Sequence, residues 1–373
     1  MFSSISSFLK SSALQNLTRE SLLKMDPEIA HQATIAALRL GFVPASENVD
    51  AVQLKTNICG LELSNPIGMA AGFDKNAQVS TALSEIGFGF CEIGTLTPRP
   101  QSGNEKPRLF RIPQAEAIIN RMGFNNEGHE AVFERLEKQN KQHKISNIIG
   151  VNIGANKDSD DFIADYVLGV KKFAQIADYL TINISSPNTK GLRNLQSYEA
   201  LKRLLDETLA ERSRAKIHVP ILLKIAPDLE EIELDEIAKL VLNSDLDGLI
   251  ISNTTITRDS VKGLENNNEM GGLSGKPLFN LSTKKLAQMR LRVGNDLPII
   301  GVGGIHSSAS AIAKLNAGAN AIQLYSALVY SGMELLDEIK TGLVKEVRIK
   351  GHDNINSLTA TNVQDWADGK VEI

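Results

Sequence analysis

The feature that most constrains the fold is an alternation of short apolar runs with helical patterns, which extends from about residue 49 to residue 350. Eight apolar runs with the character of β-strands lie at Pro66–Ala70, Phe90–Gly94, Ile148–Val151, Tyr179–Ile184, Ile221–Leu223, Gly248–Ile251, Pro298–Gly301 and Ala321–Leu324. Helical patterns lie between and after them at Asn126–Lys141, Asp161–Ala177, Ser197–Arg214, Leu229–Asn243, Ser282–Arg292, Ser307–Ala317 and Met333–Lys350. Eight such units predict an α/β fold of the (β/α)8, or TIM barrel, type. An open doubly wound sheet is the alternative, because periodicity does not show closure.

Composition narrows the class of protein. The 373 residues are 42% hydrophobic and 23% charged, as in soluble globular proteins. A net charge of −4 gives no general electrostatic reason to bind nucleic acid, so we expect no nucleic-acid partner. The two cysteines form no CxxC motif and the six histidines are scattered, so we expect no metal site. The predicted organisation is a helical extension over 1–48, a barrel over 49–350 and a tail over 351–373.

The residues that follow the apolar runs point to one shared ligand site. Chemistry in such barrels gathers at the carboxyl ends of the strands. Almost every residue there is small, polar or cationic: Ala71, Gly72, Lys75, Thr95, Asn152, Asn183 to Asn188, Lys224, Ser252 to Thr254, Gly303, Gly304, Tyr325 and Ser326. The amides and hydroxyls after the fourth run suit the binding and deprotonation of a planar, polar small molecule.

Two features favour redox chemistry on a phosphorylated cofactor. Gly303-Gly304 after the seventh run predicts a phosphate site, with the helix that starts near Ser307 pointing its N-terminus inward. Lys224 ends an apolar strand, and a buried cation needs an anionic partner, which a reduced flavin would supply. No paired carboxylates or Ser-His-Asp arrangement favour hydrolysis. A flavin-free phosphate-binding barrel, an isomerase or lyase with a Schiff base on Lys224, is an alternative.

The two ends of the chain differ from the barrel. Residues 1–19 are rich in serine and free of acidic residues, a pattern typical of an amphipathic helix or a transit peptide. A second helix is predicted from Asp26 as N-cap to Gly41, with an apolar stripe at Ile29, Ala33, Ala36, Ala37 and Leu40. These helices suit a membrane surface or a hairpin packed on the barrel. The tail, with Trp366, is expected to be flexible or a small surface packing element.

Five segments resemble the dihydroorotate dehydrogenases. They are Ala70–Asn76, Ile93–Gln101, Asn120–Asn126, Asn183–Thr189 and Gly271–Gly275, and the resemblance extends from about Asp26 to Met333 in the order and spacing of the family. The motifs are long and together specific. The resemblance implies an FMN-containing (β/α)8 barrel that oxidises dihydroorotate to orotate in pyrimidine synthesis. Another FMN barrel, acting on a different dihydropyrimidine or an enoate, would share the phosphate loops but not the set of asparagines.

The resemblance also implies roles for individual residues. The residues implied to contact FMN are Ala71, Gly72, Lys75, Thr95, Asn152, Asn183, Lys224, Ser252, Gly275, Gly304, Tyr325 and Ser326. Substrate contacts fall to Lys75, Asn120, Arg121, Met122, Gly123, Phe124, Asn183, Asn188, Asn253 and Thr254. Ser252 stands where threonine is common in the family, and it keeps the hydroxyl.

The catalytic base implied by the resemblance is Ser186. One soluble class carries cysteine at this position, whereas serine is typical of the membrane-associated class that passes electrons to a quinone. Serine is a poor base at its ordinary pKa, so deprotonation of substrate C5 needs a relay through water or neighbours. Hydride from C6 goes to flavin N5, with Lys224 near N1 and O2 of the ring.

The same class carries an Asp-Pro-Glu-x-Ala-His element, present here from Asp26 to His31. The resemblance therefore implies that the N-terminal helices rest on the membrane surface and form a quinone tunnel with His31, Arg111 and Tyr325. It implies a peripheral protein on the cytoplasmic face of a bacterial inner membrane, or alternatively at the mitochondrial inner membrane. No separate iron-sulfur electron-transfer subunit is expected. A membrane-bound adaptor without enzyme activity is the remaining alternative, and it leaves the polar strand ends unexplained.

Overall fold

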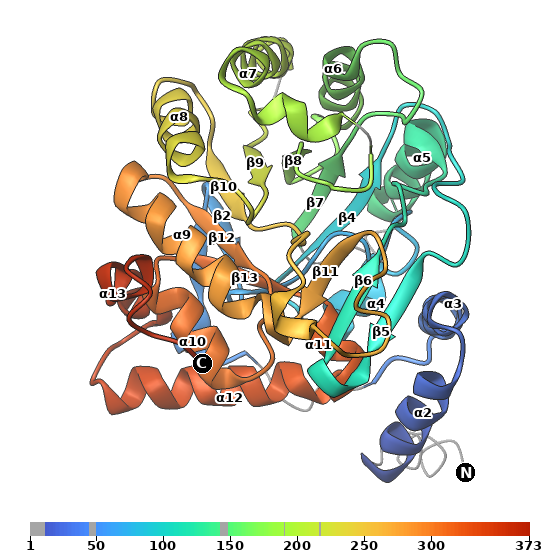
Figure 1. Cartoon of the computed structure of the whole chain (residues 1–373), viewed down its shortest axis with the longest axis vertical. Helices are drawn as coiled ribbons and strands as arrows, with labels where there is room; N and C mark the ends of the chain where they lie inside the picture. The colour runs from blue at the N-terminus through green and yellow to red at the C-terminus, as the bar shows by residue number, and fades with distance from the viewer. Residues whose placement is uncertain (1–11, 45–49, 142–147, 190, 216–217) are drawn as a thin grey trace.

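The computed structural model describes residues 12–44, 50–141, 148–189, 191–215 and 218–373. Its centre is a closed barrel of eight parallel strands (Figure 1), which confirms the predicted fold class and excludes the open sheet. The strands are β3 (Ile67–Met69), β4 (Phe90–Leu96), β7 (Ile148–Ile153), β8 (Tyr179–Asn183), β9 (Ile221–Ile225), β10 (Gly248–Ile251), β12 (Ile299–Val302) and β13 (Ala321–Leu324). They neighbour one another in this order, and β13 pairs with β3 to close the ring.

The barrel interior is built in layers because side chains alternate in direction along each strand. An apolar layer fills one end of the barrel, and it contains Phe90, Tyr179, Leu222, Ile250, Ile300 and Ala321. Two residues further along three of these strands, the side chains are Glu92, Lys224 and Gln323, which are polar and buried. The apolar layer therefore forms a floor, and the polar layer lies between that floor and the carboxyl ends of the strands.

Helices surround the barrel, seven of them close to the predicted positions, whereas those at Ser80–Ile86 and Ser326–Ser331 were not predicted. They are α4 (Ser80–Ile86), α5 (Gly128–Lys141), α6 (Phe162–Phe173), α7 (Tyr198–Arg212), α8 (Glu231–Leu242), α9 (Phe279–Val293), α10 (Ser308–Asn316), α11 (Ser326–Ser331) and α12 (Glu334–Ile349). Short 3₁₀ turns lie at Val52–Leu54, Pro113–Ala115, Leu192–Gln196, Asp259–Val261, Lys276–Leu278 and Ile355–Leu358. Side-chain caps define several helix starts: Asp161 accepts from the backbone N–H groups of Ile163 and Ala164 at the start of α6.

Two small antiparallel sheets were not predicted. The first is a hairpin of β1 (Thr56–Ile58) and β2 (Leu61–Leu63). The second joins β5 (Leu109–Ile112), β6 (Ala117–Asn120) and β11 (Gly272–Gly275), and it pairs Asn120 with both Leu109 and Gly272. This sheet joins the Asn120 segment to the glycine-rich loop at 271–275.

The N-terminal helices α2 (Ser12–Lys24) and α3 (Pro27–Arg39) lie beside β5 and β6, outside the ring of barrel helices (Figure 1). The predicted N-cap is confirmed, because Asp26 Oδ1 accepts from the backbone N–H groups of Glu28 and Ile29, both at 3.0 Å. Two residues of the predicted apolar stripe do not pack on the barrel: Ile29 is 54% exposed and Leu40 is 76% exposed.

An ion pair explains this orientation of α3. Glu28 is buried against Arg108, whose Nε lies 3.1 Å from one carboxylate oxygen and whose Nη2 lies 2.8 Å from the other. These hydrogen bonds hold the pKa of Glu28 below its usual value. Because Glu28 must face the barrel, Ile29 faces away from it.

The C-terminal segment differs from the expectation of flexibility. It forms a 3₁₀ turn and α13 (Val363–Ala367), and Trp366 is only 2% exposed. The Trp366 ring packs edge-on against Phe279 of α9, with ring centroids 5.9 Å apart. Burial of the large apolar surface of the Trp366 ring stabilises this contact between the tail and α9.

Within the described ranges, no helix has the length and apolar character needed to cross a membrane. Most of the amphipathic pattern predicted over residues 1–19 lies outside those ranges, which begin at Ser12.

The docking of the tail gives a prediction about stability. Replacing Trp366 by alanine leaves a cavity against α9, so we expect the free energy of unfolding to fall by about 3 kcal/mol. Glu372→Ala is the matched control, because Glu372 is exposed in the same segment. Urea denaturation followed by circular dichroism measures both variants. Equal stability of the two variants would show that the tail does not pack in solution.

Candidate active site

A cavity of about 1010 Å³ opens at the carboxyl ends of the barrel strands and continues to α2 and α3. It is lined by most of the residues that the sequence identifies, which are Ala71, Gly72, Lys75, Thr95, Asn120, Met122, Gly123, Phe124, Asn183, Ser186, Asn188, Lys224, Ser252, Asn253, Thr254, Gly275, Gly304, Tyr325 and Ser326, together with His31 and Arg111. The exceptions are Asn152, which lies behind this wall, and Arg121. The barrel end and the N-terminal helices therefore share one cavity.

A chain of amides connects the strand ends. Asn253 Nδ2 donates to Asn183 Oδ1 at 3.1 Å, and Asn183 Nδ2 donates to Asn152 Oδ1 and to Thr95 Oγ1, both at 3.0 Å. Asn152 Oδ1 also accepts from Thr95 Oγ1 at 2.5 Å. Asn152 thus supports the wall of the cavity from behind. The hydrogen bonds hold each carboxamide in one orientation, so the ligand meets fixed donors and acceptors.

Ser186 lies in the loop after β8, facing the cavity and buried. Its Oγ accepts from the backbone N–H of Asn188 at 3.3 Å. Asn188 Nδ2 in turn donates to Asn120 Oδ1 at 3.3 Å. The hydroxyl and the carboxamide of Asn188 are therefore held within one loop, which a hydrogen bond joins to the end of β6.

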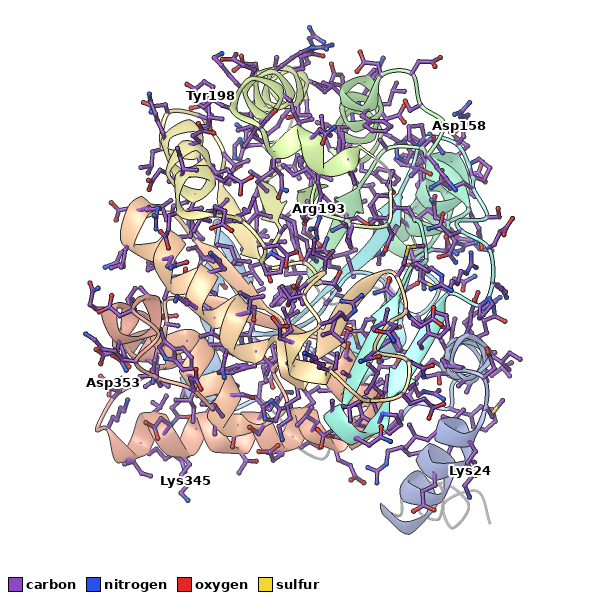
Figure 2. All side chains as sticks on the ribbon, in the orientation of Figure 1. Lys24, Asp158, Arg193, Tyr198, Lys345 and Asp353 are labelled. Carbon is purple, nitrogen blue, oxygen red and sulfur yellow. The ribbon has the colours of Figure 1, made fainter. Side chains whose placement is uncertain are left out.

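Arg193 fixes this loop from outside the cavity; Figure 2 labels it near the centre of the view. Its Nε donates to Ser185 O at 3.1 Å, its Nη1 to Asp228 at 2.9 Å and its Nη2 to Thr254 O at 3.3 Å. One guanidinium thereby joins the loops that follow β8, β9 and β10. The sequence analysis missed this role.

The anionic partner of Lys224 in the structure is Glu92, which the sequence analysis also missed. Lys224 Nζ lies 3.6 Å from Glu92 Oε1, and both side chains are buried. The carboxylate also accepts hydrogen bonds from Asn152, Tyr179, Thr181 and Gln323 at 2.7–3.2 Å. The sequence does contain a signal for Glu92. It is an acidic residue within the apolar run of β4, two residues after the inward-facing Phe90.

The loop after β12 has the form of an anion cradle. A Cβ atom on Gly303 would lie 2.9 Å from Ser282 Oγ, and one on Gly304 would lie 2.4 Å from Phe279 N. Both glycines have positive φ and line the cavity, and the absence of a Cβ lets their loop pack closely on Ser282 and Phe279. Ser326 adds a hydroxyl, which lies 2.8 Å from that of Ser274.

The N-terminus of α10 does not take the predicted place in this cradle. The backbone N–H of Ser308 donates to Glu338 Oε1 at 2.9 Å, and that of Ser310 donates to the Ser307 hydroxyl at 3.2 Å. The N–H groups of Ser308 and Ser310 therefore have hydrogen-bond partners within the protein. The cradle is formed by the loop that contains Gly303 and Gly304.

At the mouth of the cavity, His31 bridges α3 to the barrel. Its Nε2 lies 3.5 Å from Lys75 Nζ, and its Nδ1 lies 3.3 Å from the Tyr325 hydroxyl. Burial, with a smaller contribution from Lys75, lowers the pKa of His31 to about 3, so the imidazole is neutral at pH 7. Lysine can only donate, so Nε2 accepts and Nδ1–H donates to Tyr325. Burial also lowers the pKa of Lys75 to about 8.

Two predicted arginines use their charge for structure. Arg111 donates to the carbonyl oxygens of Leu22, Leu23 and Met25 at 2.8–3.2 Å, which holds the C-terminal end of α2. Arg121 turns away from the cavity, and its Nη1 lies 2.6 Å from Glu269. Arg111 thus lines the cavity and at the same time caps the C-terminal end of α2. Arg121 does not line the cavity.

Comparisons with known proteins agree with this geometry. Residues 53–347 match the family model described as dihydroorotate dehydrogenase. The dihydroorotate dehydrogenases (quinone) of Brucella melitensis biotype 2 and Agrobacterium fabrum are each 51% identical over 365 residues, 97% of this chain and 99% of theirs. The crystal structure of Eimeria tenella DHODH in complex with ferulenol is 38% identical, with a TM-score of 0.87 over 90% of this chain and 95% of that one. The chain therefore belongs to the dihydroorotate dehydrogenase family, in its quinone-dependent class.

Proposed function

We propose that this protein oxidises (S)-dihydroorotate to orotate in pyrimidine synthesis, with FMN as its cofactor and a membrane quinone as the electron acceptor. The observation that carries the proposal is the position of Ser186: it shares one cavity with the asparagine set, with the glycine cradle and with the pocket between the N-terminal helices. The family is flavin-dependent, and the described residues fit FMN in particular.

The fit to FMN rests on three features of the cavity. Gly303 and Gly304 line the cavity without side chains, which lets backbone N–H groups approach a phosphate. Lys224 is a fixed cation within the barrel, suited to a ring that gains negative charge on reduction. Gln323 lines the same cavity, and its Oε1 has no hydrogen-bond partner among the described residues.

The asparagines suit dihydroorotate, which carries ring amides and a carboxylate. Asn120, Asn183, Asn188 and Asn253 line the cavity and offer both donors and acceptors. Lys75 supplies the positive charge for the substrate carboxylate from the loop after β3. Four loops thus orient one planar ring, which lowers the entropic part of the barrier.

Oxidation removes a proton from substrate C5 and a hydride from C6, which leaves a C5=C6 double bond. Ser186 Oγ takes the C5 proton and passes it on through water. The asparagines hold the ring so that C5 faces Ser186, and Lys75 holds the carboxylate. FMN, held by the glycine cradle and Lys224, would supply the acceptor for the hydride and the two-electron link to the quinone.

The quinone enters between α2 and α3. Leu22, Ala33 and Ala37 line that end of the cavity, and His31 and Tyr325 lie where it meets the barrel. An apolar channel that ends at the Tyr325 hydroxyl, a neutral donor held in place by His31, suits a quinone, whose tail is apolar and whose ring oxygens accept hydrogen bonds.

The outer face of these helices docks on a membrane surface. Ile29, Leu40 and Phe42 are 54%, 76% and 59% exposed, and the last two also border the cavity. Side chains of this kind bury favourably at a lipid boundary, so the quinone passes from the bilayer into the cavity. The protein is peripheral in this account, on the cytoplasmic face of a bacterial inner membrane.

Ser186→Ala tests the chemistry of the first half-reaction. We expect the rate of flavin reduction by dihydroorotate to fall by about 10²- to 10⁴-fold, because the base is lost. Anaerobic stopped-flow absorbance measures this rate. Ser197→Ala, at an exposed serine before α7, is the control with an unchanged rate. A normal rate of flavin reduction in Ser186→Ala would remove Ser186 from the mechanism.

His31→Ala tests the second half-reaction. We expect reoxidation of the flavin by quinone to slow about tenfold, because the hydrogen bond that orients the Tyr325 hydroxyl at the channel end is lost. Reduction by dihydroorotate should stay within about twofold of wild type. Because His31 is neutral above a pKa of about 3, its contribution should not change between pH 5 and pH 8. Equal slowing of both half-reactions would place His31 outside the quinone path.

A further inference from the structure

The polar layer of the barrel contains a carboxylate with an unusual number of partners. Glu92 is fully buried on β4, and its Oε1 accepts from Asn152 Nδ2 at 2.7 Å. Its Oε2 accepts from Gln323 Nε2 at 2.9 Å, and Lys224 Nζ lies 3.6 Å from Oε1. Three groups at the base of the cavity therefore depend on one carboxylate.

A carboxylate can only accept, so it decides which way a neighbouring carboxamide points. The NH2 group of Gln323 must face Glu92, and its Oε1 must therefore point away from Glu92. This oxygen is buried, has no hydrogen-bond partner among the described residues, and belongs to a residue that lines the cavity. An unpaired buried acceptor costs free energy unless a ligand supplies a donor.

We propose that Gln323 is a cofactor-binding residue whose Oε1 accepts a hydrogen bond from the flavin ring, and that Glu92 is the positioning residue that orients it. The inference rests on the proposed function, because it takes FMN to be the occupant of the cavity. The oxidised isoalloxazine ring has one N–H donor, at N3, on its pyrimidine edge. An acceptor facing the oxidised ring is therefore matched to N3–H.

The same carboxylate sets the charge at the base of the cavity. Lys224 is the cation of the polar layer, and Glu92 offsets part of its charge at a distance of 3.6 Å. The reduced ring carries more negative charge than the oxidised ring. Glu92 therefore lowers the midpoint potential of the bound flavin relative to a site that holds Lys224 alone.

The first experiment exchanges the flavin of the holoenzyme. The purified holoenzyme is incubated with FMN and 3-methyl-FMN, which lacks the N3–H, and mass spectrometry measures the ratio of the two bound flavins. Wild type should prefer FMN, and Gln323→Met should lower this preference about tenfold, because methionine keeps the volume and removes the acceptor. An unchanged preference in Gln323→Met overturns the assignment of Gln323.

Gln288→Met is the matched control for this exchange. Gln288 is also a buried glutamine that donates to a glutamate, Glu231, and its Oε1 also has no partner among the described residues. It lies on α9 and does not line the cavity. Its replacement should leave the preference for FMN as in wild type. A loss as large as that in Gln323→Met would show that replacing any buried glutamine in this way lowers the preference.

The second experiment measures the midpoint potential of the bound flavin in Glu92→Gln. We expect the potential to rise, because the variant keeps Lys224 and loses the negative charge beside it. Glu231→Gln, which also removes a carboxylate but outside the barrel, should keep the wild-type potential. An unchanged or lowered potential in Glu92→Gln overturns the role of Glu92.

Different results would contradict the proposed function and the roles of Gln323 and Glu92. A wild-type protein that holds no flavin contradicts the proposed function before any variant is compared. A wild-type protein that holds FMN and is reduced by dihydroorotate, with variants that keep the FMN preference and the potential, contradicts only the inference about Gln323 and Glu92.

Discussion

Closure of the eight parallel strands is the constraint on which the site depends, because it brings loops from distant parts of the chain around one opening. The apolar floor at Phe90 and Tyr179 fills one end of the barrel, so a ligand is accessible only from the other end. Between the floor and that opening, Glu92 and Lys224 place a buried ion pair. Charges so buried persist only with partners, and Glu92 has hydrogen bonds on both oxygens. The cavity thus has a rigid, polar base.

A second ion pair connects the N-terminal helices to the loop that carries Asn188 at the cavity. Arg108 holds Glu28 of α3, and its Nη1 also donates to Ser102 O at 2.6 Å and to Asn104 O at 2.8 Å. Asn104 Nδ2 in turn donates to the carbonyl of Asn188 at 3.2 Å. The contact that seats α3 on the barrel thereby also holds the loop that carries Asn188. This arrangement explains why α3 buries a glutamate and exposes Ile29.

Local patterns predicted the barrel and most of the site. Apolar runs bounded by glycine and polar residues fix the strands, and a residue that follows a strand must lie at the barrel end, so Asn183 and Ser186 could be found from the sequence. Glu92 and Gln323 could not be found so directly, because they lie inside strands and gain their roles from partners on other strands. Hydrophobic periodicity did not show which face of α3 meets the barrel, because it ignores the ion pair of Glu28. The docking of Trp366 depends on α9, to which no local pattern points.

The most direct test of the account is anaerobic mixing of the purified protein with dihydroorotate, followed by addition of a soluble quinone, with the flavin absorbance recorded throughout. We expect the flavin absorbance to decrease when dihydroorotate is added and to return when the quinone is added. Bleaching without recovery would contradict the assignment of the N-terminal helices as the quinone site. A flavin that stays oxidised in the presence of dihydroorotate would contradict the proposal that this protein oxidises dihydroorotate.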